Sequence, residues 1–405
     1  GDPDNYSERY LEKAFAQYQP DEASGADFQN PDVIVILSES FWDPTTLKNV
    51  SFTEDPIPNY RRILAENHGG SMVSCTFGGG TVRPEFEILT GMTTSMLPSG
   101  NVPYQQYVFN SIYSYAREFK NQGYDTIGIH TYQKEFYERD RAYPLLGFDE
   151  MLGEYDLHAE QHFNSGPFLT DESLVEEIMY QLEQPHEKGV FIQGITMENH
   201  GLYLNKFDPS EWNIDFTSDA LSEEESNLLH NYCKGVSDSD AQLGRLYEYV
   251  MNREKPTVVL WYGDHLPSLG DNYLCYRALG MDMTADRETE DWLDAYAPPF
   301  VMWANQAGAD VLDFDTLAER LGIPQNGMLS ASFLGAAVLD AVGCGQSDAF
   351  FAFVNSLRRE WPVIQRGTGI DAQGNYLPAL DGTAADAVKE YQDRTYYRMK
   401  YETVE

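Results

Sequence analysis

The stretch Val33-Ile34-Val35-Ile36-Leu37-Ser38-Glu39 places a carboxylate directly after a short, wholly apolar run. A run that is apolar at every position predicts a strand buried on both faces, as in a parallel sheet covered by helices. Val258-Val259-Leu260-Trp261-Tyr262-Gly263-Asp264-His265 has the same form and ends in an acid and a histidine. The two stretches therefore predict polar side chains at the ends of two buried strands.

Around these two stretches, apolar runs alternate with helical patterns along the chain. Further strands are predicted at residues 70–76, 126–130, 190–196 and 300–303, and helices at 110–122, 171–182 (with Thr170 as N-cap) and 224–251. This alternation predicts an α/β fold with a doubly wound, mostly parallel central sheet flanked by helices. Ligands of such folds bind at the carboxyl ends of strands, where Glu39, His130 and Asp264 are expected.

A third stretch supplies a hydroxyl group: Gly78-Gly79-Gly80-Thr81-Val82-Arg83-Pro84-Glu85. The glycines would let the backbone approach a ligand and would expose the Thr81 side chain, although a flexible turn is the simpler alternative. Residues 82–91 follow with a helical pattern. Thr81 is therefore expected near a helix N-terminus, where free N–H groups and the helix dipole favour a phosphate.

Together these segments predict a metal site. A threonine hydroxyl is a poor nucleophile at neutral pH, and a metal ion can activate it by lowering its pKa. Glu39, Thr81, Asp264 and His265 would form a mixed oxygen and nitrogen ligand set, which suits zinc or manganese better than calcium or copper(I). Taken alone, Glu39 could instead be a surface carboxylate at a strand end.

The chain resembles the ectodomains of lipoteichoic acid synthases and related phosphoglycerol transferases, in the sulfatase-like branch of the alkaline phosphatase superfamily. Ser38-Glu39-Ser40 and Gly263-Asp264-His265 resemble that family's metal segments, and Gly80-Thr81-Val82-Arg83-Pro84-Glu85-Phe86-Glu87-Ile88-Leu89-Thr90-Gly91 and Val102-Pro103-Tyr104-Gln105-Gln106-Tyr107 its nucleophile region. The resemblance implies an alkaline phosphatase/sulfatase-like fold. It also implies one divalent metal ion, commonly manganese with zinc or magnesium as alternatives, and Thr81 as nucleophile.

Two further segments are similar to the family. Gly128-Ile129-His130 and Phe136-Tyr137-Glu138-Arg139 resemble its substrate stretch, which implies that Arg139 grips the substrate phosphate while His130 and Tyr137 line the pocket. Glu198-Asn199-His200-Gly201 resembles the segment that supplies an active-site histidine, which implies a catalytic His200. Without the resemblance, Arg139 could pair with Glu138 or Asp140 on the surface, and His200 could be an ordinary loop histidine.

The implied reaction is phosphoglycerol transfer from a phosphatidylglycerol-type lipid head group through Thr81. Hydrolysis of a phosphodiester and phosphoethanolamine transfer are alternatives with the same metal set, and an inactive module that binds glycerophosphate polymer is an alternative of another class. Sulfate ester hydrolysis is disfavoured, because sulfatases proper convert a Cys or Ser to formylglycine and threonine cannot give that aldehyde.

The composition of the chain limits the kinds of molecule that it is expected to bind. The 405 residues include 65 acidic and 27 basic side chains, for a net charge of -38, so nucleic acid is a poor partner. The glycerophospholipid head group and glycerophosphate polymer are anionic as well, so local positive charge must offset this repulsion. The resemblance implies the extracellular face of a bacterial cytoplasmic membrane, with attachment through a preceding segment. The four cysteines form no CxxC pair, and buried free thiols are favoured over a disulfide.

Three parts are expected: a lead-in segment at residues 1–30, a catalytic domain at 31–343, and a small C-terminal subdomain at 344–405. Residues 202–225 and 270–296 are polar and follow candidate site segments, so each is either a lid or a surface excursion.

Overall fold

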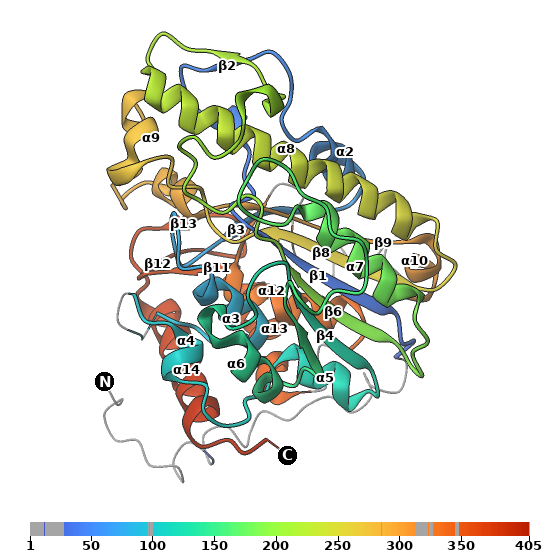
Figure 1. The fold of residues 1–405 in the computed structure, drawn as a ribbon. Coiled ribbons are helices and arrows are strands. Elements are labelled where there is room, and N and C mark those ends of the chain that lie inside the picture. Colours follow the sequence, from blue (N-terminus) through green and yellow to red (C-terminus); the bar gives the residue numbers. More distant parts are fainter. Residues whose placement is uncertain are drawn as a thin grey trace.

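The computed structural model describes residues 12, 28–95, 97, 100–284, 286–312, 323, 327–344 and 348–404. Most of the lead-in segment predicted at residues 1–30 lies outside them. At the centre is an eight-stranded sheet with helices on both faces (Figure 1). Among the described residues, no helix combines the length and the apolar character that crossing a membrane requires.

The sheet is mostly parallel, as predicted. Only β9 runs antiparallel to its neighbours, β3 and β8. The strands are, from one edge to the other, β10 (Gly327–Ser330), β3 (His68–Val73), β9 (Pro299–Ala304), β8 (Thr257–Gly263), β1 (Asp32–Ser38), β6 (Val190–Ile195), β4 (Asp125–His130) and β5 (Glu150–Leu152).

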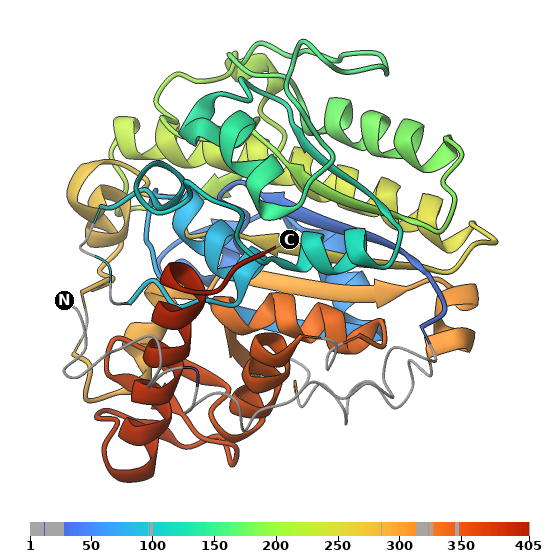
Figure 2. The ribbon, with the colours of Figure 1, turned by 90° about the horizontal axis from the view of Figure 1, so that it is seen from below.

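The central strand β1 shows why its sequence is apolar at every position. Alternate side chains point to opposite faces, so Val33, Val35 and Leu37 join one hydrophobic core while Ile34 and Ile36 join the other. Helices on the first face are α3 (Val82–Thr90), α4 (Pro103–Gln106), α5 (Tyr115–Asn121), α6 (Arg139–Leu146), α12 (Ala331–Ala341) and α13 (Ala349–Glu360), and those on the second are α2 (Pro58–Glu66), α7 (Asp171–Glu183), α8 (Glu223–Met251) and α9 (Leu274–Ala278). Figure 2 shows the two layers on either side of the sheet.

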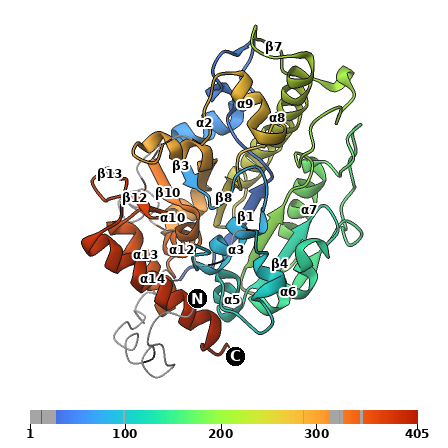
Figure 3. The ribbon, with the colours of Figure 1, turned by 90° about the vertical axis from the view of Figure 1, so that its left-hand side faces the viewer.

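A small second sheet confirms the predicted C-terminal subdomain. It is antiparallel and consists of β11 (Val363–Gln365), β12 (Thr368–Ile370) and β13 (Tyr376–Leu377), followed by α14 (Gly382–Lys400). Helices α13 and α14 and this sheet lie on one side of the molecule, opposite α7 and α8 (Figure 3). The Tyr391 hydroxyl donates to the Gly91 carbonyl at 2.6 Å, so α14 is fastened to the end of α3.

Several local predictions need correction. The helix predicted at residues 110–122 begins only at Tyr115, because the Ser114 hydroxyl accepts a hydrogen bond from the Ala116 N–H and caps it there. Thr170 is the N-cap of α7, but its side chain makes no capping bond. The strand predicted at residues 70–76 is β3, which ends at Val73. Strands β5 and β10 were not predicted, because they are too short to show a pattern.

The polar stretch at residues 202–225 contains the short elements η4 (Pro209–Glu211) and β7 (Phe216–Thr217), and the stretch at residues 270–296 contains η5 (Asp271–Tyr273) and η6 (Glu290–Tyr296). The remaining elements are η2 (Pro44–Thr46), β2 (Ser51–Phe52), η3 (Phe136–Glu138) and α10 (Gln306–Leu312). All four cysteines are free thiols, as predicted. Three of them are buried, and Cys75 is partly exposed.

Candidate active site

The register of two neighbouring strands brings the predicted metal ligands together. Strands β1 and β8 are parallel, and Ser38 pairs with Gly263 at their carboxyl ends. The next residues, Glu39 and Asp264, therefore leave the sheet side by side. Gly263 is required here, because a Cβ at this position would lie 2.0 Å from the Phe41 carbonyl oxygen.

The glycine turn before α3 delivers the hydroxyl group. Gly80 adopts a φ of 73°, which side chains other than glycine rarely tolerate, and Thr81 follows as the N-cap of α3. The Thr81 Oγ1 atom lies 2.6 Å from Asp264 Oδ2, 3.1 Å from Glu39 Oε2 and 3.3 Å from His265 Nε2. The four residues, although far apart in the sequence, are thus in contact, and all are buried.

The charges of this cluster are out of balance without a cation. Glu39 and Asp264 are almost completely shielded from water, and burial together with the Glu39 charge raises the pKa of Asp264 to about 7. Burial disfavours the charged form of His265, but the Asp264 and Glu39 carboxylates outweigh it and raise the pKa of His265.

These residues fit a single divalent metal ion. One ligand atom from each of Glu39, Asp264 and His265 lies within 4.8 Å of the others. The Ser40 N–H donates to Asp264 Oδ1 at 2.8 Å, and His265 Nδ1 donates to the Leu266 carbonyl at 2.8 Å, which leaves His265 Nε2 facing the cluster. Backbone groups thus fix the orientation of two ligands, as is typical of metal sites.

Arg139 does not pair with Glu138 or Asp140 on the surface. It is 1% exposed and forms an ion pair with Glu85 of α3, with Nη2 3.0 Å from Glu85 Oε1. Glu85 also accepts a hydrogen bond from the Tyr104 hydroxyl at 2.6 Å. Among the described residues, Arg139 Nη1 has no hydrogen-bond partner although it is buried. One donor of a fixed guanidinium therefore stays available to an anion.

His130 and Tyr137 lie around this guanidinium. His130 Nδ1 donates to the Ile195 carbonyl at 3.1 Å, and its buried Nε2 has no partner in the described part of the chain. Burial and the nearby Arg139 charge lower the pKa of His130, so its ring is neutral. The Tyr137 ring centre lies 5.4 Å from the Arg139 guanidinium carbon. The three residues implied for substrate binding are thus near one another.

His200 is held by a lysine that the sequence analysis missed. His200 Nδ1 donates to the Gly201 carbonyl at 2.6 Å, and Lys206 Nζ donates to the carbonyls of His200, at 2.6 Å, and Glu198. Burial lowers the pKa of His200, and lowers that of Lys206 to about 8. A lone lysine in a polar stretch gives no signal of burial, and neither does Glu85 within its helical pattern.

The buried pair of Arg139 and Glu85 leads to a prediction of stability. Replacing Arg139 by methionine should lower the free energy of unfolding by about 3–5 kcal/mol, because Glu85 is left as an uncompensated buried charge. Urea denaturation measures this loss. The double variant Arg139→Met/Glu85→Gln should recover most of it, since glutamine is neutral and still accepts from Tyr104. A double variant as unstable as the single one would contradict this explanation.

Fold and site together define a class: an α/β fold similar to that of a solved alkaline phosphatase superfamily protein from Vibrio parahaemolyticus, with a candidate metal centre at the carboxyl ends of its strands. Residues 31–344 match the family model described as Sulfatase, and the chain belongs to this family.

Three individual proteins are similar to this chain over more than half of its length. A putative cyclic beta-1,2-glucan modification protein of Rhizobium meliloti is 37% identical over 281 residues, which are 69% of this chain and 42% of that protein. The matching part of the chain thus spans less than half the length of this curated relative. Streptococcus pyogenes phosphoglycerol transferase GacH, solved with sn-glycerol-1-phosphate, is 23% identical with a TM-score of 0.74 over 98% of this chain and 94% of its own. Lipoteichoic acid synthase LtaP from Listeria monocytogenes is 17% identical with a TM-score of 0.65 over 98% and 100%.

Proposed function

We propose that this chain is the catalytic part of a metal-dependent phosphoglycerol transferase with Thr81 as nucleophile. The observation that carries the proposal is the contact of Thr81 Oγ1 with Asp264, Glu39 and His265 at 2.6–3.3 Å. A hydroxyl surrounded by two carboxylates and an imidazole suits activation by a cation. The catalytic part is residues 31–343, with residues 344–405 as an appended subdomain.

Glu39, Thr81, Asp264 and His265 would hold one divalent ion, Mn²⁺ in our proposal. When bound, it would supply positive charge that lowers the pKa of the Thr81 hydroxyl and stabilises negative charge on the phosphoryl group. The N-terminus of α3, which begins at the next residue, Val82, adds to that stabilisation.

The donor is a phosphatidylglycerol-type lipid head group. In the first step, the bond from Thr81 Oγ1 to phosphorus forms and the bond from phosphorus to the lipid alcohol breaks. The hydroxyl proton of Thr81 ends on the departing diacylglycerol. His200, whose pKa responds to the charges of Asp264 and His265, is neutral with Nε2 as a proton acceptor, and it relays the proton. Arg139, with His130 and Tyr137 beside it, binds the phosphate.

In the second step, the bond from an acceptor hydroxyl oxygen to phosphorus forms, the bond from Thr81 Oγ1 to phosphorus breaks, and the proton of the acceptor hydroxyl ends on Thr81. The sn-glycerol-1-phosphate complex of GacH supports a glycerophosphate substrate. The name of the Rhizobium meliloti relative mentions a cyclic beta-1,2-glucan, which supports a glucan as acceptor, and the family resemblance implies a glycerophosphate polymer as the alternative. We place the reaction at the extracellular face of a bacterial cytoplasmic membrane.

Head-group preference tests the function. The protein loaded with Mn²⁺ should release diacylglycerol from phosphatidylglycerol at least about tenfold faster than from phosphatidylethanolamine in mixed micelles, because the Arg139 guanidinium repels the ammonium group of ethanolamine but not the neutral glycerol. Mass spectrometry should detect a glycerophosphoryl adduct on Thr81. Faster release from phosphatidylethanolamine would favour phosphoethanolamine transfer instead, and turnover of p-nitrophenyl sulfate alone would favour a sulfatase.

A further inference from the structure

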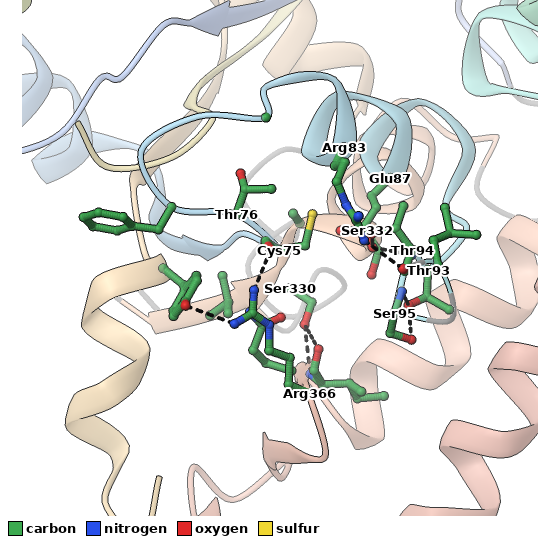
Figure 4. A pocket seen from close by; sticks show the side chains of 18 of the residues that line it. Cys75, Thr76, Arg83, Glu87, Thr93, Thr94, Ser95, Ser330, Ser332 and Arg366 are labelled. Atoms are coloured by element: carbon green, nitrogen blue, oxygen red, sulfur yellow. Dashed lines mark hydrogen bonds between the residues drawn. The ribbon is translucent and has the colours of Figure 1, made fainter. Parts of the chain in front are cut away.

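A cavity of about 940 Å³ lies behind the glycine turn that precedes Thr81. Its walls come from residues 75–77, 79 and 80, α3, residues 93–95 and 97, the start of α12, the turn between β11 and β12, and α14 (Figure 4). It therefore lies between the catalytic part of the chain and the C-terminal subdomain. The volume is far larger than a few water molecules need and is in the range of pockets that bind small molecules.

The charge of this cavity is opposite to that of the chain. Its charged lining side chains are Arg83, Arg287, Arg366 and Glu87, whereas the whole chain has 65 acidic and 27 basic residues. Glu87 is turned toward Thr94, from which it accepts hydrogen bonds at 2.8 Å from N–H and 3.1 Å from Oγ1. Burial raises the pKa of Glu87, which reduces its opposition to an anion.

Two of the arginines, both exposed, donate hydrogen bonds to neutral groups. Arg366 donates to the Tyr296 hydroxyl at 3.0 Å and to the Cys75 carbonyl at 3.1 Å, and its guanidinium lies 4.7 Å from the Tyr296 ring centre. Arg287 donates to the Arg366 carbonyl at 3.0 Å. Within the described part of the chain, neither forms an ion pair with a carboxylate. Their charge is therefore held ready for an anionic ligand.

The rest of the lining is rich in hydroxyl and amide groups. Such groups, with arginine, are suited to a polyol that also carries a negative charge. They include Thr76, Thr93, Ser95, Ser332 and Gln392. In Figure 4, Arg83 and Glu87 enter from α3 on one side, and Arg366 and Ser330 from the opposite side.

The cavity reaches the backbone of the nucleophile turn. Gly79 and Gly80 are part of its wall, and a Cβ added at Gly79 would meet no atom within 4 Å. A ligand in the cavity thus lies against the backbone that leads into Thr81.

We propose that this cavity is a binding site for an anionic saccharide, a sugar that carries a phosphate or carboxylate group and is held by Arg287 and Arg366. If the chain transfers phosphoglycerol as proposed above, the saccharide is a segment of the acceptor, anchored next to Thr81. The binding site itself does not depend on that reaction.

Calorimetric titration tests the site in the full chain with the Thr81→Ala substitution, so that no turnover occurs. The probes are glucose 6-phosphate, glucuronate, glucose and inorganic phosphate. We expect an anionic sugar to bind more tightly than glucose or phosphate, because it uses both the arginines and the hydroxyl groups. Arg287→Gln/Arg366→Gln should weaken this binding about tenfold or more.

The matched control is Arg62→Gln, an exposed arginine of α2 outside the cavity, which should leave the affinity unchanged. If the double variant does not fold, Gly79→Leu fills the cavity instead and should also weaken binding. Anionic sugars that bind no more tightly than phosphate, or binding that the cavity variant does not weaken, would overturn the proposal. Binding that is confirmed without phosphoglycerol transfer by the wild-type chain would overturn the proposed reaction alone.

Discussion

Thr81→Ala is expected to reduce diacylglycerol release from phosphatidylglycerol by about 10⁴-fold or more, to near the background rate. Removal of a nucleophile has effects of this size in enzymes that form a covalent intermediate, because the residual rate comes from the remaining site groups. The measurement is the initial rate with saturating metal ion, together with mass spectrometry of the trapped adduct.

The matched control is Thr81→Ser, which keeps the hydroxyl and removes only a methyl group. It should retain measurable turnover and form the adduct on serine. Thr81→Ser should unfold at about the wild-type temperature, because it keeps the hydroxyl contacts with Asp264 and Glu39, whereas Thr81→Ala loses them and should unfold at a slightly lower temperature. Thr81→Ala with the activity of the wild type would show that Thr81 is not the nucleophile.

Removing the metal ion with a chelator is expected to abolish turnover and to lower the unfolding temperature by an amount that depends on pH. In the metal-free protein the pKa of Asp264 is about 7, well above its ordinary value of 3.8, and that of His265 is raised as well. Both groups then hold a proton at low pH, and a binding metal ion must displace it. Metal affinity should therefore fall about tenfold or more for each pH unit below 7.

The same pKa shifts determine how the stability of the metal-free protein changes with pH. A group whose folded pKa is raised stabilises the fold below its unfolded pKa, and this contribution of Asp264 is lost as pH rises through about 7. Metal-free protein should thus become less stable as pH rises from about 4 to about 7, while the loaded protein does not. Differential scanning fluorimetry should show the gap in unfolding temperature widening with pH. In Asp264→Asn the gap should be small at every pH, and a wild-type gap that narrows would contradict the account.

Most of what the sequence predicted about this site came from the residues at the strand ends. Each apolar run around Val33 and Val258 predicted a buried strand, and the polar residues that end them followed directly in the chain. The glycine turn gave Thr81 its place before a helix for a similar local reason. The assignment of Arg139, Tyr137 and His200 came from the family resemblance, because single polar residues away from strand ends have no local pattern, and the strand-end position of His130 was predicted without its role.

The sequence did not predict interactions between segments that are far apart in the chain. The pairing of Arg139 with Glu85 spans two helices, and the burial of Lys206 depends on the carbonyls of residues 198 and 200 and on aromatic rings around it. The strands β5 and β10 were also missed. Each has only three or four residues and is stabilised by its neighbour in the sheet more than by its own sequence.

The sequence by itself determined the alternation of buried strands and helices, and with it the polar residues at the strand ends, because burial selects apolar side chains locally. Only the tertiary structure decided that β1 and β8 are neighbours in a register that pairs Ser38 with Gly263, and that the C-terminal sheet closes an arginine-lined cavity behind the glycine turn before Thr81. The reason is physical: register and cavity shape arise from packing between segments hundreds of residues apart, and no local pattern encodes the distance between them.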